Sequence, residues 1–153
     1  MKGRLAAIPF VLALACGGSN NNSGSSGGNP NNFLGSTWNG SVNTTVSCPG
    51  QPPQSALTTY TVAFSQSSDA DLQYTSSAGC TFKFRLSGNT ASLSNAPVSC
   101  TATSGGLTVN VVVTTYTLTT SDGHNLSISA SGSTTDTSSQ TSCPFSQSGT
   151  ATR

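Results

Sequence analysis

The sequence predicts an all-β domain: an antiparallel, up-and-down meander of about eight strands that closes into a barrel. Apolar and polar residues alternate with period two from Trp38 onward, which in a strand sends successive side chains to opposite faces. Short clusters of Gly, Asn, Asp and Ser separate the alternating runs, as in tight hairpins between neighbours in sequence. A closed barrel would bury the single apolar face without leaving edges, and a two-sheet β-sandwich is the alternative.

The first fifteen residues, 1–15, are predicted to be an export signal. Lys2 and Arg4 precede an apolar stretch of about ten residues, well short of the ~20 that a membrane-spanning helix needs. The segment Ala13-Leu14-Ala15-Cys16 resembles the lipobox of bacterial lipoproteins, although leucine is more usual where Ala13 stands. The resemblance implies cleavage before Cys16 and acylation of that cysteine. Ordinary signal-peptide cleavage is the alternative, and it would leave Cys16 as a free thiol.

The number of cysteines favours the lipid anchor. The chain has five cysteines, and four of them can pair within the domain, whereas a leftover secreted thiol would be reactive. Acylation of Cys16 uses the fifth, and several acyl chains on one residue hold a protein firmly on a membrane. Gly17 follows, where lipoproteins of the inner membrane tend to have aspartate, so we expect a cell-envelope protein of the outer membrane.

Residues 16–32 are predicted to be the lipidated cysteine and a flexible tether of Gly, Ser and Asn, and residues 33–153 to be one barrel domain. Two of the five basic residues lie in the signal, which leaves Lys83, Arg85 and Arg153 in the domain. Three scattered cations cannot supply the phosphate contacts of nucleic-acid binding. We therefore expect no nucleic-acid partner, membrane attachment through the lipid anchor alone, and a monomer.

Three irregularities interrupt the alternation. The strand that begins at Leu107 changes phase near Thr114, which predicts a β-bulge, and Pro97 should mark a corner or an exposed edge. The connections Pro49–Ser55 and Ser133–Ser142 are the longest and are therefore candidate functional or mobile loops. The cluster Asn95-Ala96-Pro97 is predicted to form a tight hairpin, and whether 71–86 is one bent strand or two stays open.

The first predicted strand carries a second resemblance. Gly35 and Trp38 resemble the glycine-and-tryptophan signature that opens lipocalin-like barrels, with two residues between them where the family has one. The resemblance implies a basic residue near the end of the domain that packs over the tryptophan, and Arg153 fits that role. Small lipocalin-like barrels of bacterial envelopes can also inhibit proteases.

The four remaining cysteines are in phase with the apolar face, so both bridges should be internal. With an even number of strands, the last strand runs antiparallel beside the first, and Cys48 at the end of one then faces Cys143 at the start of the other. The sequence thus predicts a Cys48–Cys143 bridge and, by elimination, Cys80–Cys100. No two cysteines have metal-ligand spacing, so no metal or other cofactor is expected.

Little in the domain favours catalysis. His124, the only histidine, follows the turn-forming Asp122 and Gly123, and serine is too frequent for a neighbouring one to be informative. Asp69 and Asp71 are expected to be solvated turn residues, and Lys83 and Arg85 to face outward.

Aromatic side chains at inward positions either fill the barrel or line a cavity, and composition does not distinguish the two. Candidate lining residues are Trp38, Tyr60, Phe64, Tyr74, Phe82, Phe84 and Phe145, with Tyr116 out of step. The sequence therefore favours a non-catalytic envelope lipoprotein that binds a small apolar ligand or another protein. A protease inhibitor and a structural surface spacer are the alternatives.

Overall fold

A computed structural model of the chain describes residues 28–104 and 107–153. Over these residues the fold is all-β, as predicted, with ten strands in one antiparallel sheet and one short 3-10 helix, η1 (Pro30–Asn32). The expected signal 1–15, Cys16 and most of the tether lie outside the described residues. No helix within the described part is long and apolar enough to cross a membrane.

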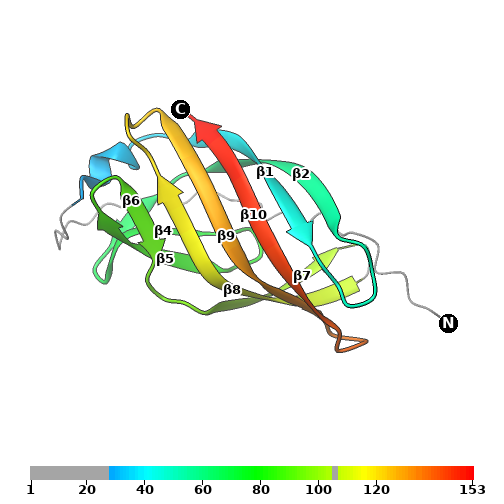
Figure 1. Cartoon of the computed structure of the whole chain (residues 1–153). Coiled ribbons are helices and arrows are strands. Elements are labelled where there is room, and N and C mark those ends of the chain that lie inside the picture. The colour runs from blue at the N-terminus through cyan, green and yellow to red at the C-terminus, as the bar shows by residue number, and fades with distance from the viewer. Residues whose placement is uncertain (1–27, 105–106) are drawn as a thin grey trace.

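The sheet brings the two ends of the domain together. Its order is β2-β1-β10-β9-β8-β6-β5-β4-β3, with β7 also paired to β8, and Figure 1 shows β10 between β1 and β9. The strands are β1 (Trp38–Val46), β2 (Gln54–Val62), β3 (Ser65–Ser67), β4 (Ala70–Thr75), β5 (Thr81–Ser87), β6 (Thr90–Leu93), β7 (Val98–Ser104), β8 (Leu107–Thr119), β9 (Asn125–Asp136) and β10 (Ser142–Thr152).

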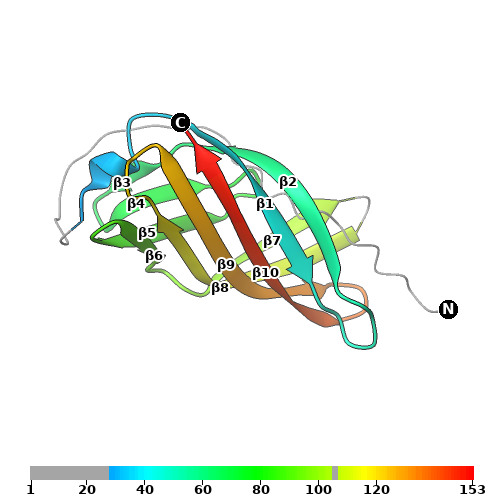
Figure 2. The ribbon, with the colours of Figure 1, turned by 45° about the horizontal axis from the view of Figure 1, so that its top comes forward.

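The predicted closure into a barrel is wrong, because no ladder joins β2 to β3 among the described residues. Only Ala63 and Phe64 separate these two strands, and the chain bends there so that β2 pairs with β1 whereas β3 pairs with β4. The sheet is therefore open, and it bends until β4 and β5 lie behind the long strands β9 and β10 (Figures 1 and 2). An open sheet or a sandwich describes it better than a closed barrel.

The count of ten strands exceeds the predicted eight because β3 was not expected and because residues 71–86 form two strands. The two strands on either side of residues 95–97, β6 and β7, lie end to end along the same edge of β8. Asn95-Ala96-Pro97 is therefore a corner rather than the predicted hairpin, and Pro97 is exposed there, as expected. Residues 71–86 form two strands, β4 and β5, rather than one.

The predicted bulge in β8 is confirmed, since the register between β8 and β9 shifts between Val113 and Thr115. A bulge adds one residue to one strand and reverses the faces that follow it. Val113 and Tyr116 are consequently both buried on the inner side, at 1% and 7% exposure. The alternation alone left Tyr116 out of step, and the bulge turns it into the core.

Inward glycines allow the strands to approach one another where the sheet bends. Gly132 on β9 is paired with Val113 on one side and Phe145 on the other. A Cβ atom at Gly132 would lie 2.9 Å from the Phe145 ring, closer than real side chains come. Gly40 and Gly149 are equally crowded by neighbouring backbone. These three positions therefore need glycine for close approach rather than for an unusual backbone angle.

The second predicted long loop is shorter than the sequence indicates. β9 continues to Asp136 and β10 begins at Ser142, which leaves residues 137–141 as the turn. Asp136 closes it by accepting hydrogen bonds from the Ser138 amide at 2.8 Å and the Ser139 hydroxyl at 2.9 Å. The first loop is also shortened, since β2 already begins at Gln54.

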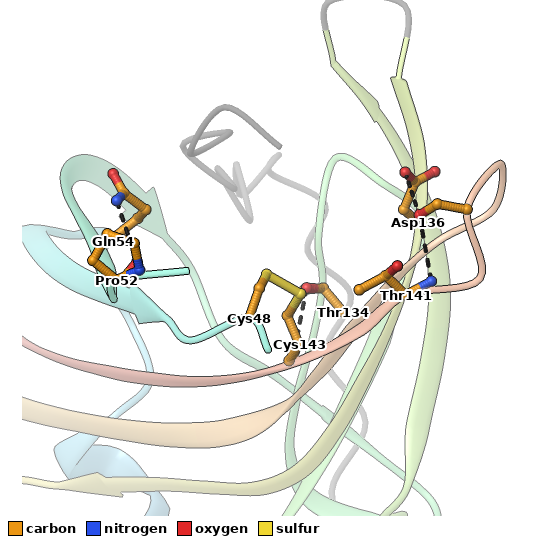
Figure 3. Close-up of a disulfide and its surroundings, with 8 residues drawn as sticks. Cys48, Pro52, Gln54, Thr134, Asp136, Thr141 and Cys143 are labelled. Atoms are coloured by element: carbon orange, nitrogen blue, oxygen red, sulfur yellow. Dashed lines mark hydrogen bonds between the residues drawn. A yellow bond between two sulfur atoms is a disulfide. The ribbon is translucent and has the colours of Figure 1, made fainter. Parts of the chain in front are cut away.

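Both predicted disulfides are present. Cys48, just after β1, is bonded to Cys143 near the start of β10, with their Cα atoms 4.5 Å apart. Figure 3 shows this bridge close to the β9–β10 turn. Cys80, just before β5, is bonded to Cys100 on β7, which ties β7 to the turn between β4 and β5.

Candidate functional site

One end of the interior is sealed, and we call it the closed end; Trp38, Phe33 and Arg153 form it. Trp38 and Phe33 are fully buried, and the indole Nε1 donates to the Phe33 carbonyl at 2.9 Å. The Arg153 guanidinium lies 4.6 Å from the centre of the Trp38 ring, where the sequence resemblance placed it. It donates to four main-chain carbonyls, those of Asn31, Asn32, Leu34 and Gly123.

Phe33 and the short helix η1 were not expected in this role, because composition assigns residues 30–32 to the tether. Phe33 is the first aromatic residue after the run of Gly, Ser and Asn, and its burial is indicated in the sequence by that position alone. Asn29 caps η1 by accepting from the Asn31 amide at 3.1 Å. The folded structure thus includes the last residues of the predicted tether.

An aromatic cluster occupies the interior next to the closed end. Tyr74 stacks on Phe82 and Phe84, with ring centroids 5.0 and 6.0 Å apart, and Tyr116 meets both phenylalanines edge-on. The members of this aromatic cluster are Phe33, Phe64, Tyr74, Phe82, Phe84 and Tyr116. Four of the seven predicted lining residues are in this cluster. Of the others, Trp38 lies beneath Arg153, Phe145 is buried on β10, and Tyr60 is half-buried on β2.

All three tyrosines of the protein interact electrostatically in this interior, although they come from β2, β4 and β8. Burial raises the pKa of the Tyr116 phenol to about 12. Burial also raises the pKa of Tyr60 and of Tyr74 well above the usual value of a phenol. All three side chains are therefore uncharged at neutral pH and can donate a hydrogen bond.

Two of these phenols have buried hydroxyls without a hydrogen-bond partner. They are the hydroxyls of Tyr60 and Tyr74, which we call the phenol pair. Tyr74 is 5% exposed as a whole residue. A buried polar group left unpaired costs roughly 1–3 kcal/mol, so native proteins usually supply a partner. The described residues supply none for the Tyr60 hydroxyl, and for the Tyr74 hydroxyl they supply only an interaction with the neighbouring Tyr116 phenol.

At the opposite end of the interior, the inner positions of the strands are only partly buried, in contrast to the fully buried positions around Trp38. We call these residues the open end: Val46, Ala56, Thr58, Tyr60, Cys100, Ala102, Leu107 and Thr134. Figure 2 shows β7 and the start of β2 together at this end of the molecule, opposite η1. Tyr60 belongs to both the open end and the phenol pair.

The other buried polar side chains are engaged by neighbouring groups of the protein. Gln147 and Thr44 are both 6% exposed, and the Gln147 amide donates to the Thr44 hydroxyl at 2.9 Å. Asp136 is buried, and its carboxylate accepts hydrogen bonds from Ser138 and Ser139 of the β9–β10 turn. Asp71 is also buried, against the expectation of a solvated residue, because its carboxylate accepts the Leu86 amide at 2.8 Å.

The basic residues of the described chain lie away from this interior. Lys83 forms an ion pair with the exposed Asp69, and the Arg85 guanidinium is 3.7 Å from the Asp71 carboxylate. Both alternate along β5 with buried phenylalanines and so face outward, as predicted. Arg153 is held at the closed end.

The remaining candidates from the sequence are not brought together. His124 is exposed, and its amide donates to Asp122 at 2.8 Å within the β8–β9 turn. Across residues 28–104 and 107–153, no three His, Cys, Asp or Glu side chains are grouped as metal ligands. Comparison with protein-family models, with curated proteins and with solved structures finds no match to the chain.

Proposed function

We propose that the chain is a lipoprotein of the bacterial cell envelope, held at the outer membrane through Cys16, and that its domain binds a small, mainly apolar molecule without catalysing a reaction. The observation that carries the binding proposal is the phenol pair. Binding sites for small molecules are mostly apolar and place a few polar groups at defined positions. Aromatic walls with two unpaired hydroxyls, reached from an open end, meet this description.

The geometry supports entry from one side only. Arg153 and its four carbonyl acceptors cover Trp38 at the closed end. The partly exposed inner residues at the other end favour entry there. A molecule that enters there would reach Tyr60 first, since this residue is half-buried while Tyr74 and Tyr116 are buried.

The resemblance to lipocalin-like barrels belongs to the same proposal. It is supported by Gly35 and Trp38 at the start of the domain and by Arg153 over the indole ring. The unpaired edges of β2 and β3 depart from a closed barrel. We therefore propose a related ligand-binding role on an open sheet.

Native mass spectrometry of the protein purified from its own host tests the binding proposal. We expect a mass above that of the acylated, doubly disulfide-bonded polypeptide, and we expect the excess to be lost on denaturation. The released molecule would then be identified directly. Preparations that carry only the polypeptide, and that also take up no apolar probe, would contradict the proposal.

Metabolic labelling with a fatty acid tests the anchor. We expect the chain to incorporate label and to sediment with membranes. The Cys16→Ser variant should lose both properties, because serine cannot form the thioether to which the lipid is attached. An equally labelled Cys16→Ser variant would show that the lipid is elsewhere, and a wild-type chain without label would show that Cys16 is not acylated.

A further inference from the structure

We infer that the molecule bound in the interior is electrically neutral and carries a group that accepts hydrogen bonds from the phenol hydroxyls of Tyr60 and Tyr74. This inference rests on the proposed binding function and adds the chemical class of the ligand to it.

The phenol pair calls for an acceptor. A phenol has one proton to donate and lone pairs to accept with; Tyr60 meets no partner among the described residues, and Tyr74 meets only another phenol, Tyr116. A ligand group that only donates would leave the Tyr60 proton unpaired. A carbonyl, ether or hydroxyl oxygen has two lone pairs and can accept from both phenols at once.

The interior could not compensate an anionic ligand. The cations of the described residues are committed elsewhere, Lys83 to Asp69 and Arg153 to main-chain carbonyls at the closed end. Arg85 is half exposed on the outer face. The phenols themselves are neutral, because burial raises their pKa. An anion transferred from water would lose its hydration without gaining an opposite charge, which is strongly unfavourable.

A cationic ligand fits no better. The two buried carboxylates are the available counter-charges, and each already accepts hydrogen bonds from the protein. Asp71 accepts the Leu86 amide, and Asp136 accepts from Ser138 and Ser139. The other buried polar pair, Gln147 and Thr44, is neutral and satisfies itself by a direct hydrogen bond. Since neither an anion nor a cation would find a free counter-charge, the ligand that suits this interior is a neutral molecule with a hydrogen-bond acceptor.

Three probes that share one ring system test the inference: 1-acetylnaphthalene, 1-ethylnaphthalene and 1-naphthoate. The first is a neutral acceptor, the second has a similar shape without an acceptor, and the third carries a negative charge. Their dissociation constants would be measured by calorimetry on the full chain with Cys16→Ser, which keeps the protein free of detergent. We expect 1-acetylnaphthalene to bind about tenfold more tightly than each of the others, since ~1.4 kcal/mol of hydrogen bonding corresponds to tenfold.

Two variants locate the effect. Tyr60→Phe and Tyr74→Phe each remove one hydroxyl and keep the ring, so we expect either to reduce the preference for 1-acetylnaphthalene over 1-ethylnaphthalene by roughly fivefold. Thr59→Val removes an exposed hydroxyl from the outer face of the same strand, β2, and should change none of the three constants. Denaturant unfolding of each variant would show that the fold is retained.

The outcomes separate the inference from the proposed function. Binding of 1-naphthoate as tight as that of 1-acetylnaphthalene would overturn the inference, and so would a preference unchanged in both phenylalanine variants. In either case, binding of the naphthalene ring would still uphold an apolar site. If none of the three probes binds, the proposed function fails, and the inference fails with it.

Discussion

Each tyrosine of this protein is placed where its hydroxyl has little access to water. Tyr74 and Tyr116 are buried within the aromatic cluster, and the Tyr60 hydroxyl is buried although its ring is half exposed. A phenol in such a place is disfavoured as a phenolate, because burial penalises the charged form. Ionisation of these buried tyrosines should therefore reduce the stability of the fold at high pH.

We expect the domain to unfold in alkali as its tyrosines ionise. A group whose pKa is higher in the folded than in the unfolded state contributes stability that is fully present below the unfolded pKa, near 10, and is lost as pH rises through the folded pKa. For Tyr116 that window runs from about 10 to about 12. Phenolate absorbance and the circular dichroism of the β-sheet should therefore change together above pH 10.

The control for this titration is the same chain in concentrated urea, where all three phenols should ionise near pH 10. Phenolate absorbance that rises near pH 10 in the native protein, with the β-sheet signal unchanged, would mean that the tyrosines are exposed. The structure would then be wrong about the interior.

At the scale of elements, β2 differs from the other edges of the sheet. β3 has only three residues and a register shift against β4, and the disulfide at Cys100 ties β7 to the β4–β5 turn. β2 has nine residues without a charge or a proline, and the described part of the chain pairs only one of its sides. Its Leu57 is 72% exposed. Proteins commonly protect such edges with charged residues, because a free strand can pair with another chain.

A charge on this edge should make the isolated domain more soluble. We expect Leu57→Lys to raise the concentration at which light scattering detects association, and to change the free energy of unfolding by less than about 0.5 kcal/mol, as for other surface substitutions. Thr59→Lys, on the same face two residues along, should act in the same direction. Association that is unchanged in both variants would show that β2 does not mediate it.

At the scale of the whole molecule, two disulfides brace the open sheet. Cys48–Cys143 spans 95 residues and Cys80–Cys100 spans 20. Bridging a longer loop removes more conformational entropy from the unfolded chain. The resulting stabilisation of the folded state is about 4 to 5 kcal/mol for the first bridge and about 3 kcal/mol for the second.

Removal of the first bridge should therefore cost more. We expect the double variant Cys48→Ala/Cys143→Ala to lose more free energy of unfolding than Cys80→Ala/Cys100→Ala, as measured by denaturant titration under oxidising conditions. The opposite order would indicate that the tie between β7 and the β4–β5 turn holds an element that does not fold without it. Equal losses would indicate that loop length does not govern either bridge.

The strands could be predicted because the period-two pattern is local, and the disulfide pairs because an even number of hairpin-linked strands places the last strand beside the first. The period-two pattern identifies inward positions such as Phe82 and Phe84, and hairpin connections place β10 beside β1. The bulge near Thr114 also left a mark in the sequence, as a change of phase.

The features that the sequence did not reveal depend on contacts between distant segments. Whether β2 pairs with β3 depends on how sharply the chain bends at Ala63 and Phe64, which periodicity does not record. Phe33 and Asp71 are buried through contacts with Trp38 and Leu86. The phenol pair could not be foreseen either, because a tyrosine with a bonded hydroxyl and one without have the same pattern in sequence.

The position of β10 has a consequence for biosynthesis. Thr44 and Gln147, which bond across β1 and β10, lie 103 residues apart in the chain. The amino-terminal strand must therefore wait for β10 before its neighbour on that side exists, and the first disulfide must wait as well. In a nascent chain this part of the sheet can therefore form only after the last strand has been synthesised.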